Sequence, residues 1–243
     1  MNILGVDIED HSRKSIRSSI DRFLREPKFH QVATVNPEFL LEVDKNDRFR
    51  DVLNDCDLRV VDGFGVVLAG WFRGVHLHRY PGADLMTDLL VRAEREHLPV
   101  FFAVRKDGLS SFKDVAYAVR KKYPKLIFSG NECTIDDVRL TNGSDRESYS
   151  KIMNHASKII LCNFGAPEQE LFLAGLEKED TLLRVGMGVG GALDFLTGKR
   201  KRAPKVMRAM GFEWLFRLVI QPKRVARIWN ATVVFLWKSF RRN

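Results

Sequence analysis

The chain has 243 residues, of which 45% are apolar and 29% are charged, and its formal net charge is +9. This length allows one large domain with an appendage, or two small domains, and the apolar fraction supports an ordinary hydrophobic core. Scattered cysteines at positions 56, 133 and 162, with no CxxC pair, argue against a disulfide framework or a zinc site and favour a reducing compartment. No apolar run reaches the roughly 18 residues needed to span a bilayer, and we expect no secretion signal.

The first 198 residues alternate between short apolar runs and amphipathic patterns. We expect strands at 3–8, 31–36, 58–63, 100–104, 125–130, 158–165 and 182–188, and helices at 12–26, 82–97 and 110–123. Strands that are apolar on both faces and alternate with helices predict an α/β fold with a Rossmann-like, largely parallel sheet and helices on both faces. Ligands bind such sheets at the carboxyl ends of the strands, so the residues that follow the strands are the candidates for a site.

The positive charge is concentrated at the end of the chain. Residues 199–243 hold thirteen of the 40 Lys and Arg residues and one of the 31 acids, Glu213. Such a basic arm predicts an anionic partner, either nucleic acid or a membrane surface. The cations are interleaved with large apolar residues, which suit a lipid interface better than a phosphate groove. We therefore expect a catalytic core at 1–198 and a membrane-docking appendage at 199–243, with two amphipathic helices broken at Gln221-Pro222.

Three small polar side chains close two of the predicted strands. Asp62 ends the strand 58–63, where a carboxylate suits general base catalysis, although spacing alone favours an ordinary Asp-Gly turn with Gly63. Thr34 and Asn36 end the strand 31–36 on one side, which suits the orientation of a sugar or a phosphate. The alternative for these two is a helix cap before Pro37.

A glycine turn and a glutamine follow two later strands. Gly186, Gly188 and Gly191 have the GxGxxG spacing that lets backbone N–H groups approach a phosphate. The acidic residue expected about 20 positions later would fall in the basic arm, so a tight strand-to-helix turn is an equally good explanation. Gln169 follows Pro167 at a helix start, and we expect it to point into the cleft.

Two pairs of residues are candidate metal ligands. Asp55 and Asp57 form a DxD motif, but they precede the strand 58–63 and so lie at its amino end, away from the expected site. His76 and His78 have no evident third ligand. We therefore expect neither a metal nor another cofactor.

Seven segments occur in one order and together carry a family resemblance. They are Thr34-x-Asn36-Pro37, Val61-Asp62-Gly63, Arg79 with Gly82-x-Asp84, Gly165-x-Pro167-x-Gln169-Glu170, residues 188–198, Arg202-Ala203-Pro204, and residues 213–218. This order resembles the WecG/TagA/CpsF family of bacterial glycosyltransferases over residues 3–230. The resemblance implies an inverting, metal-independent transfer from a UDP-sugar to an undecaprenyl-diphosphate-linked saccharide at the inner face of the cell membrane. It also implies that the products are cell-surface polysaccharides or teichoic acids, and that the sugar is N-acetylmannosamine, its uronic acid or glucose.

The resemblance also assigns roles to individual residues. It implies that Asp62 is the catalytic base, that the pocket includes Thr34, Asn36, Arg79 and Gln169, and that the donor diphosphate meets Arg217, Arg224 and Arg227. Two segments depart from the family pattern. The loop at 104–109 lacks the usual glycine pair, and the chain reads RYPG before the helix 82–97 where the family has R-[VI]-[TS]-G.

Two other classes of function remain open. A nucleic-acid-binding protein would explain the charge of the arm, although not its Trp and Phe content. A Rossmann-type oxidoreductase would use the GMGVGG turn. The transferase interpretation expects a UDP-sugar, a lipid-linked acceptor and an anionic membrane as partners, no nucleic acid, and allows a homo-oligomer.

Overall fold

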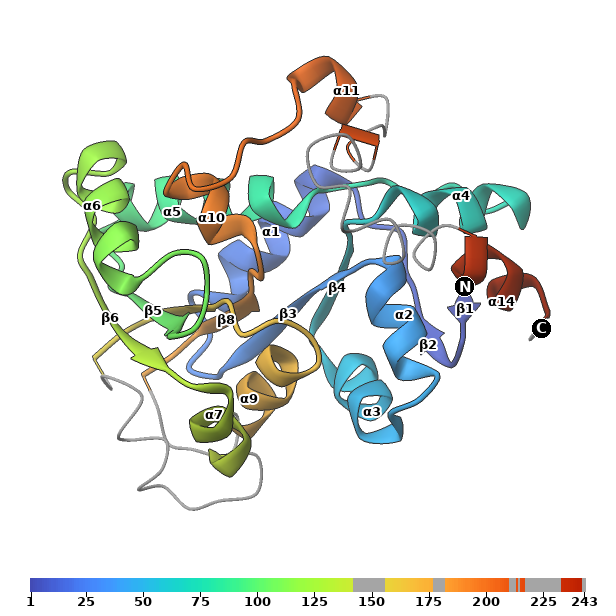
Figure 1. Cartoon of the computed structure of the whole chain (residues 1–243), viewed down its shortest axis with the longest axis horizontal. Coiled ribbons are helices and arrows are strands. Elements are labelled where there is room, and N and C mark those ends of the chain that lie inside the picture. Colours follow the sequence, from blue (N-terminus) through green and yellow to red (C-terminus); the bar gives the residue numbers. More distant parts are fainter. Residues whose placement is uncertain (142–155, 177–181, 210–212, 214, 217–232, 242–243) are drawn as a thin grey trace.

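The computed structural model describes residues 1–141, 156–176, 182–209, 213, 215–216 and 233–241 (Figure 1). Its centre is a six-stranded, wholly parallel sheet in the order β4-β3-β8-β7-β5-β6. The strands are β3 (His30–Val35), β4 (Leu58–Val61), β5 (Val100–Arg105), β6 (Phe128–Cys133), β7 (Ile159–Cys162) and β8 (Val185–Gly188). The predicted break at 221–222, and with it Arg217, Arg224 and Arg227, lies outside the described residues.

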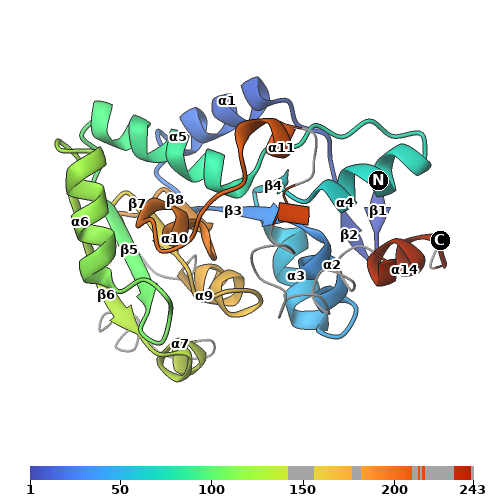
Figure 2. The same cartoon turned by 45° about the horizontal axis from the view of Figure 1, so that its top comes forward.

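Helices cover both faces of this sheet, as Figure 2 shows. On one face lie α1 (Arg13–Phe23), α5 (Gly82–Arg95), α6 (Phe112–Lys122) and α10 (Ala192–Leu196). On the other lie α2 (Pro37–Val43), α3 (Asp47–Asp55), α4 (Phe64–Phe72), α7 (Ile135–Thr141) and α9 (Glu168–Leu176). Successive strand residues serve opposite faces, so Phe101 packs with α9 while Phe102 packs with α5. The predicted α/β, Rossmann-like fold is confirmed.

The predicted strand at 3–8 is wrong. Residues 2–7 form a hairpin instead, in which β1 (Asn2–Ile3) pairs antiparallel with β2 (Val6–Asp7) outside the main sheet. Leu4 and Gly5 both have positive φ, 53° and 86°, which is the geometry of a tight hairpin turn. The apolar run is therefore two short strands folded on each other, and their buried side chains pack into the same cluster as α2 and α4.

The strand at the other edge of the sheet starts later than expected. We predicted it at 125–130, whereas β6 runs from Phe128 to Cys133 and pairs only with β5. Its central residues Ser129, Gly130 and Asn131 are polar or small and not buried. An edge strand needs no continuous apolar run. The prediction followed the apolar residues, and these begin before β6.

Two short helices are described in the arm: α11 (Lys205–Ala209) and α14 (Phe235–Arg241). The Phe235 side chain is completely buried among side chains of α2 and α4, and Lys238 donates to Asp44 at the end of α2. The end of the arm thus packs on the core. Within the described residues, no helix combines the length and the apolar character that a membrane crossing requires.

Candidate functional site

A cavity of about 790 Å³ opens at the carboxyl ends of β3, β4, β7 and β8. This volume is in the range of small-molecule sites in proteins. Seven of the residues selected from the sequence line it: Thr34, Asn36, Asp62, Arg79, Gln169, Gly188 and Gly191. The arm contributes to the same walls through Arg200, Lys201, Arg202, Glu213 and Phe216. The cavity therefore joins the strand ends to the basic segment.

Asp62 owes its position to a close approach between the end of β4 and the start of α2. The N–H groups of Asp62 and Gly63 both donate to the Val35 carbonyl, at 2.9 and 3.3 Å. A Cβ on Gly63 would lie 2.4 Å from Cδ of Pro37, so only glycine fits there. Because Gly63 has an ordinary φ of −79° and begins α4, this Asp-Gly pair does not form the turn considered above.

Asn36 has the capping role that was the alternative interpretation. Its Oδ1 accepts from the N–H groups of Glu38, at 2.9 Å, and Phe39, at 3.2 Å, while Pro37 occupies the first position of α2. Thr34 is buried and packs against Gly82, where an added Cβ would lie 3.1 Å from the threonine side chain. Both residues line the cavity while fixing the helices that surround it.

Gln169 ties two loops of the cavity together. Its Oε1 accepts from the N–H groups of Gly165, at 3.1 Å, and Gly190, at 3.2 Å, and its Nε2 donates to Oε1 of Glu170, at 2.7 Å. The side chain is buried, and all three of these bonds are internal. Gln169 thus sets the distance between the loop after β7 and the loop after β8, a positioning role that its place at a helix start had not indicated.

Packing explains two of the three glycines in the GxGxxG spacing. A Cβ on Gly186 would lie 2.4 Å from the ring of Phe29, and one on Gly188 would lie 2.4 Å from Nε2 of Gln169. Gly186 faces the packed interior and is absent from the cavity lining. Gly191 faces the cavity, with the guanidinium of Arg200 3.4 Å from the position of its Cβ. The strand-to-helix turn therefore accounts for this spacing without a dinucleotide.

Glu170 is a fully buried acid beneath this turn. Burial, only partly opposed by the hydrogen bond from Gln169, raises the pKa of the Glu170 carboxyl to about 8. Its Oε2 makes no hydrogen bond within the described part of the chain. Burial therefore favours the protonated form of the Glu170 carboxyl, which its place at a helix start did not indicate.

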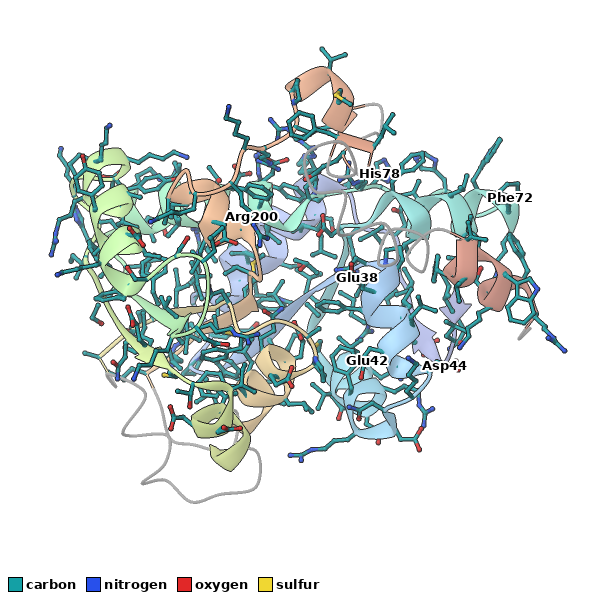
Figure 3. The ribbon with its side chains drawn as sticks, in the orientation of Figure 1. Glu38, Glu42, Asp44, Phe72, His78 and Arg200 are labelled. Atoms are coloured by element: carbon teal, nitrogen blue, oxygen red, sulfur yellow. The ribbon has the colours of Figure 1, made fainter. Side chains whose placement is uncertain are left out.

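Arg200 is a cavity cation that the sequence analysis did not select. Its Nη1 lies 3.4 Å from Oδ2 of Asp194, a buried carboxylate whose Oδ1 accepts from the hydroxyl of the buried Ser110 at 2.8 Å. Figure 3 shows Arg200 close to α10, while Glu38 extends from α2. On the side of α10 and the arm the cavity thus has cations together with the carboxylates Asp194 and Glu213, whereas α2 supplies only carboxylates, Glu38 and Glu42. Both charges lie in the segment DFLTGKR, residues 194–200. Helical spacing does not predict that side chains six residues apart will pair.

The loop that departs from the family pattern also contributes charges. Arg105 binds Asp107 through two nitrogens, Nε at 2.8 Å and Nη2 at 2.6 Å, and both residues line the cavity. This pairing raises the pKa of Arg105 and lowers that of Asp107.

Arg79 joins the end of β4 to the arm. Its Nε donates to the Asp62 carbonyl at 2.6 Å, its Nη1 to the Arg208 carbonyl at 3.0 Å, and its Nη2 to Oε2 of Glu213 at 3.2 Å. We expected a pocket residue, and Arg79 does line the cavity, but its guanidinium is engaged with the protein itself. Glu213 is the only acid of the arm. The charge count alone could not predict that it would pair with Arg79.

Asp84 makes a second connection between the core and the arm. Its Oδ1 accepts from Nη1 of Arg202 at 2.7 Å and of Arg208 at 3.2 Å. Burial opposes ionisation of Asp84, but the hydrogen bond and the nearby arginine charges prevail, so its pKa is lowered. Two arm arginines and one arm acid therefore bind the core next to the cavity.

The candidate metal ligands lie elsewhere. Asp57 precedes β4 at the amino end of the sheet, as expected, where its oxygens accept from the Gln31 N–H at 3.0 Å and bond the His30 ring at 2.8 Å. His78 binds Asp10 at 2.8 Å. Among the residues described, no group of three or more His, Cys, Asp or Glu side chains is arranged to hold a metal ion.

The strand ends of this Rossmann-like sheet bring a carboxylate and several guanidinium groups into one cavity, and ligands bind sheets of this class at that edge. The sequence profile of the Glycosyl transferase WecG/TagA/CpsF family matches residues 1–243, and the chain belongs to this family. Two similar proteins come from Staphylococcus aureus, strains MRSA252 and NCTC 8325. They are 28% identical to this chain over 241 and 243 residues, covering 98% of it and 91% of each relative. Both are named N-acetylglucosaminyldiphosphoundecaprenol N-acetyl-beta-D-mannosaminyltransferase. The resemblance found in the sequence is confirmed.

Proposed function

We propose that this glycosyltransferase moves a sugar from a UDP-sugar to a saccharide linked to undecaprenyl diphosphate, with inversion at the anomeric carbon. The observation that carries the proposal is the meeting of Asp62 with a cluster of cations in one cavity at the strand ends. The names of the relatives supply the acceptor, and they favour N-acetylmannosamine as the sugar, with its uronic acid and glucose as alternatives. The β-linkage in those names is what one displacement on an α-linked UDP-sugar would produce.

Asp62 is the base in this proposal. Its carboxylate takes the proton from the acceptor hydroxyl as that oxygen attacks the anomeric carbon and the bond from this carbon to the UDP oxygen breaks. Two backbone hydrogen bonds to Val35 and one from Arg79 hold the Asp62 main chain in place. A fixed main chain is what general base catalysis needs, since the oxygen must stay within hydrogen-bonding distance of the acceptor.

Cations near the glycine turn stabilise the departing UDP. Arg200, held by Asp194 beside Gly191, and Lys201 line the cavity on this side. Guanidinium groups form short, charge-assisted bonds with phosphate oxygens, so they offset the charge that develops on the leaving group. We propose that Arg217, Arg224 and Arg227 add to this cluster.

We propose that the transfer needs no metal and no other cofactor. The support is positional: Asp55 and Asp57 lie at the amino end of β4, and Asp57 already binds His30 and Gln31. The diphosphate would then depend on the protein's own cations. We also propose that residues 199–243 dock the enzyme on the inner face of the bacterial membrane, where its acceptor would lie, and that the core comprises residues 1–198.

Replacement of Asp62 tests the proposal. Asp62→Asn keeps the shape and removes the basicity, so turnover should fall by roughly 10² or more while UDP-sugar affinity changes little. Glu42→Gln is the matched control, because Glu42 is a second carboxylate of the same cavity, on α2, and should keep most of the turnover. Near-normal turnover in a folded Asp62→Asn enzyme would remove Asp62 as the base.

A further inference from the structure

The helix α4 is unusual for a helix at the surface. All nine of its residues, Phe64–Phe72, are apolar or glycine, yet only Val66, Ala69 and Gly70 are buried. A helix that is apolar on every side is normally enclosed by protein or lipid. On α4 the large side chains that remain exposed are Phe64, Trp71 and Phe72.

The exposed aromatic residues at the end of α4 adjoin exposed aromatic residues of α14. Trp71 and Phe72 are 71% and 57% exposed, and on α14 Trp237 and Phe240 are 55% and 46% exposed. The Phe72 ring lies 5.5 Å from the rings of both Trp71 and Phe240. Figure 1 shows the two helices side by side at one end of the molecule, and Figure 3 shows Phe72 at that periphery. We call these four residues the aromatic surface.

The two helices are held together, so the aromatic surface is a single unit. Arg73, which follows α4, donates to the carbonyls of Ser239 and Asn2. Lys238 donates to Asp44, and Phe235 is completely buried beneath. A core helix and the end of the arm thus present their aromatic side chains in one fixed arrangement.

The charges around the aromatic surface favour a lipid partner. Arg73 flanks it and the guanidinium of Arg241 lies 5.0 Å from the Trp237 ring centre, whereas the charge of Lys238 is offset by Asp44. Residues 64–78 contain no acid, and Asp44 is already bound to Lys238. Trp and Phe beside Lys and Arg suit the headgroup region of an anionic bilayer. A symmetric contact with a second copy would instead bring like charges together.

We propose that the aromatic surface docks on anionic lipid, so that α4 forms a second, core-derived membrane contact beside the arm. This inference rests on the proposed function and adds a geometric consequence. The first residues of α4, Phe64 and Gly65, line the cavity, whereas its last residues belong to the aromatic surface. A nine-residue helix rises about 13 Å, so the cavity lies within that distance of the lipid. A lipid-linked acceptor would then reach Asp62 along the apolar side of α4.

Vesicle binding tests this placement. Trp71→Ala with Phe72→Ala should lower affinity for phosphatidylcholine vesicles that contain phosphatidylglycerol by about tenfold or more, because two large apolar contacts are lost. The matched control is Tyr117→Ala with Ile127→Ala, which removes side chains that are 71% and 51% exposed on α6 and before β6. The control should bind vesicles like the unaltered protein. Equal binding by the two double variants would overturn the proposal.

Activity measurements separate this inference from the proposed function. With a short-chain, water-soluble acceptor, the Trp71→Ala, Phe72→Ala protein should keep its turnover, since neither residue lines the cavity. With the long-chain acceptor in vesicles its turnover should fall. If the unaltered protein is inactive on both acceptors, the transferase proposal fails. The docking proposal then depends on the vesicle-binding result alone. If the variant binds vesicles normally but changes from dimer to monomer, the aromatic surface is a protein interface and the proposal fails.

Discussion

The buried carboxyl of Glu170 makes the stability of this enzyme depend on pH in an unusual direction. Its pKa is raised to about 8 in the folded protein, against an ordinary value of 4.5. Between these two values the folded state holds a proton that the unfolded state has released. The contribution of Glu170 to the free energy of unfolding therefore decreases as the pH rises from about 4.5 to 8, whereas carboxylates with lowered pKa values act in the opposite direction.

The size of the effect follows from the shift. One pKa unit corresponds to about 1.36 kcal/mol, so complete ionisation of Glu170 costs on the order of 5 kcal/mol in stability above pH 8. Glu170→Gln cannot ionise, and its amide oxygen still accepts from Nε2 of Gln169. The variant should match the unaltered protein near pH 5 and become the more stable of the two by pH 8.

Urea unfolding at several pH values measures this difference. The quantity of interest is the difference in the free energy of unfolding between Glu170→Gln and the unaltered protein, because titration of other groups largely cancels in it. Glu42→Gln, at a half-buried acid on α2, should keep the pH dependence of the unaltered protein. A difference for Glu170→Gln that stays constant from pH 5 to 8.5 would refute a raised pKa at this site.

Two further predictions concern the arm and the metal. Glu213→Gln removes the charge that faces Arg79, and because breaking a largely buried ion pair costs about 3–5 kcal/mol, the arm should become sensitive to protease at 199–243 while residues 1–198 stay resistant. Unchanged protease resistance would mean that other contacts hold the arm. Turnover should persist in excess EDTA, and its loss with recovery on adding magnesium or manganese would restore Asp55 and Asp57 as candidate ligands.

The sequence predicted the sheet well, because parallel strands buried on both faces are continuous apolar runs. β3 and β5 begin or end within one residue of the expected positions. β7 ends three residues earlier and β8 begins three residues later than expected, and the two departures that change the assignment lie at the margins of the fold. The turn at Leu4 and Gly5 interrupts what reads as one strand, and β6 is an edge strand without an apolar run.

The site was predictable in position but less so in the role of each residue. Strand ends in an α/β sheet converge, so the sequence alone could place Thr34, Asp62 and Gly188 at one cavity. Roles depend on partners distant in the sequence. Gln169 bonds Gly190, and Arg79 bonds Glu213, 134 residues later. No spacing rule connects residues that meet only through the tertiary fold.

The charges of the arm differ between the side that faces the core and the side that faces away from it. Toward the core, Glu213 meets Arg79, and Arg202 and Arg208 meet Asp84, so each of these charges has a partner beside the cavity. Away from the core, Arg241 stacks near Trp237 with no carboxylate bound to it among the described residues. Positive charges gathered on a surface in water repel one another, which lowers stability. The same charges are attracted to anionic lipid. The single acid therefore lies where the arm meets the protein, and in the proposed docking Arg241 would be a cation that faces the lipid.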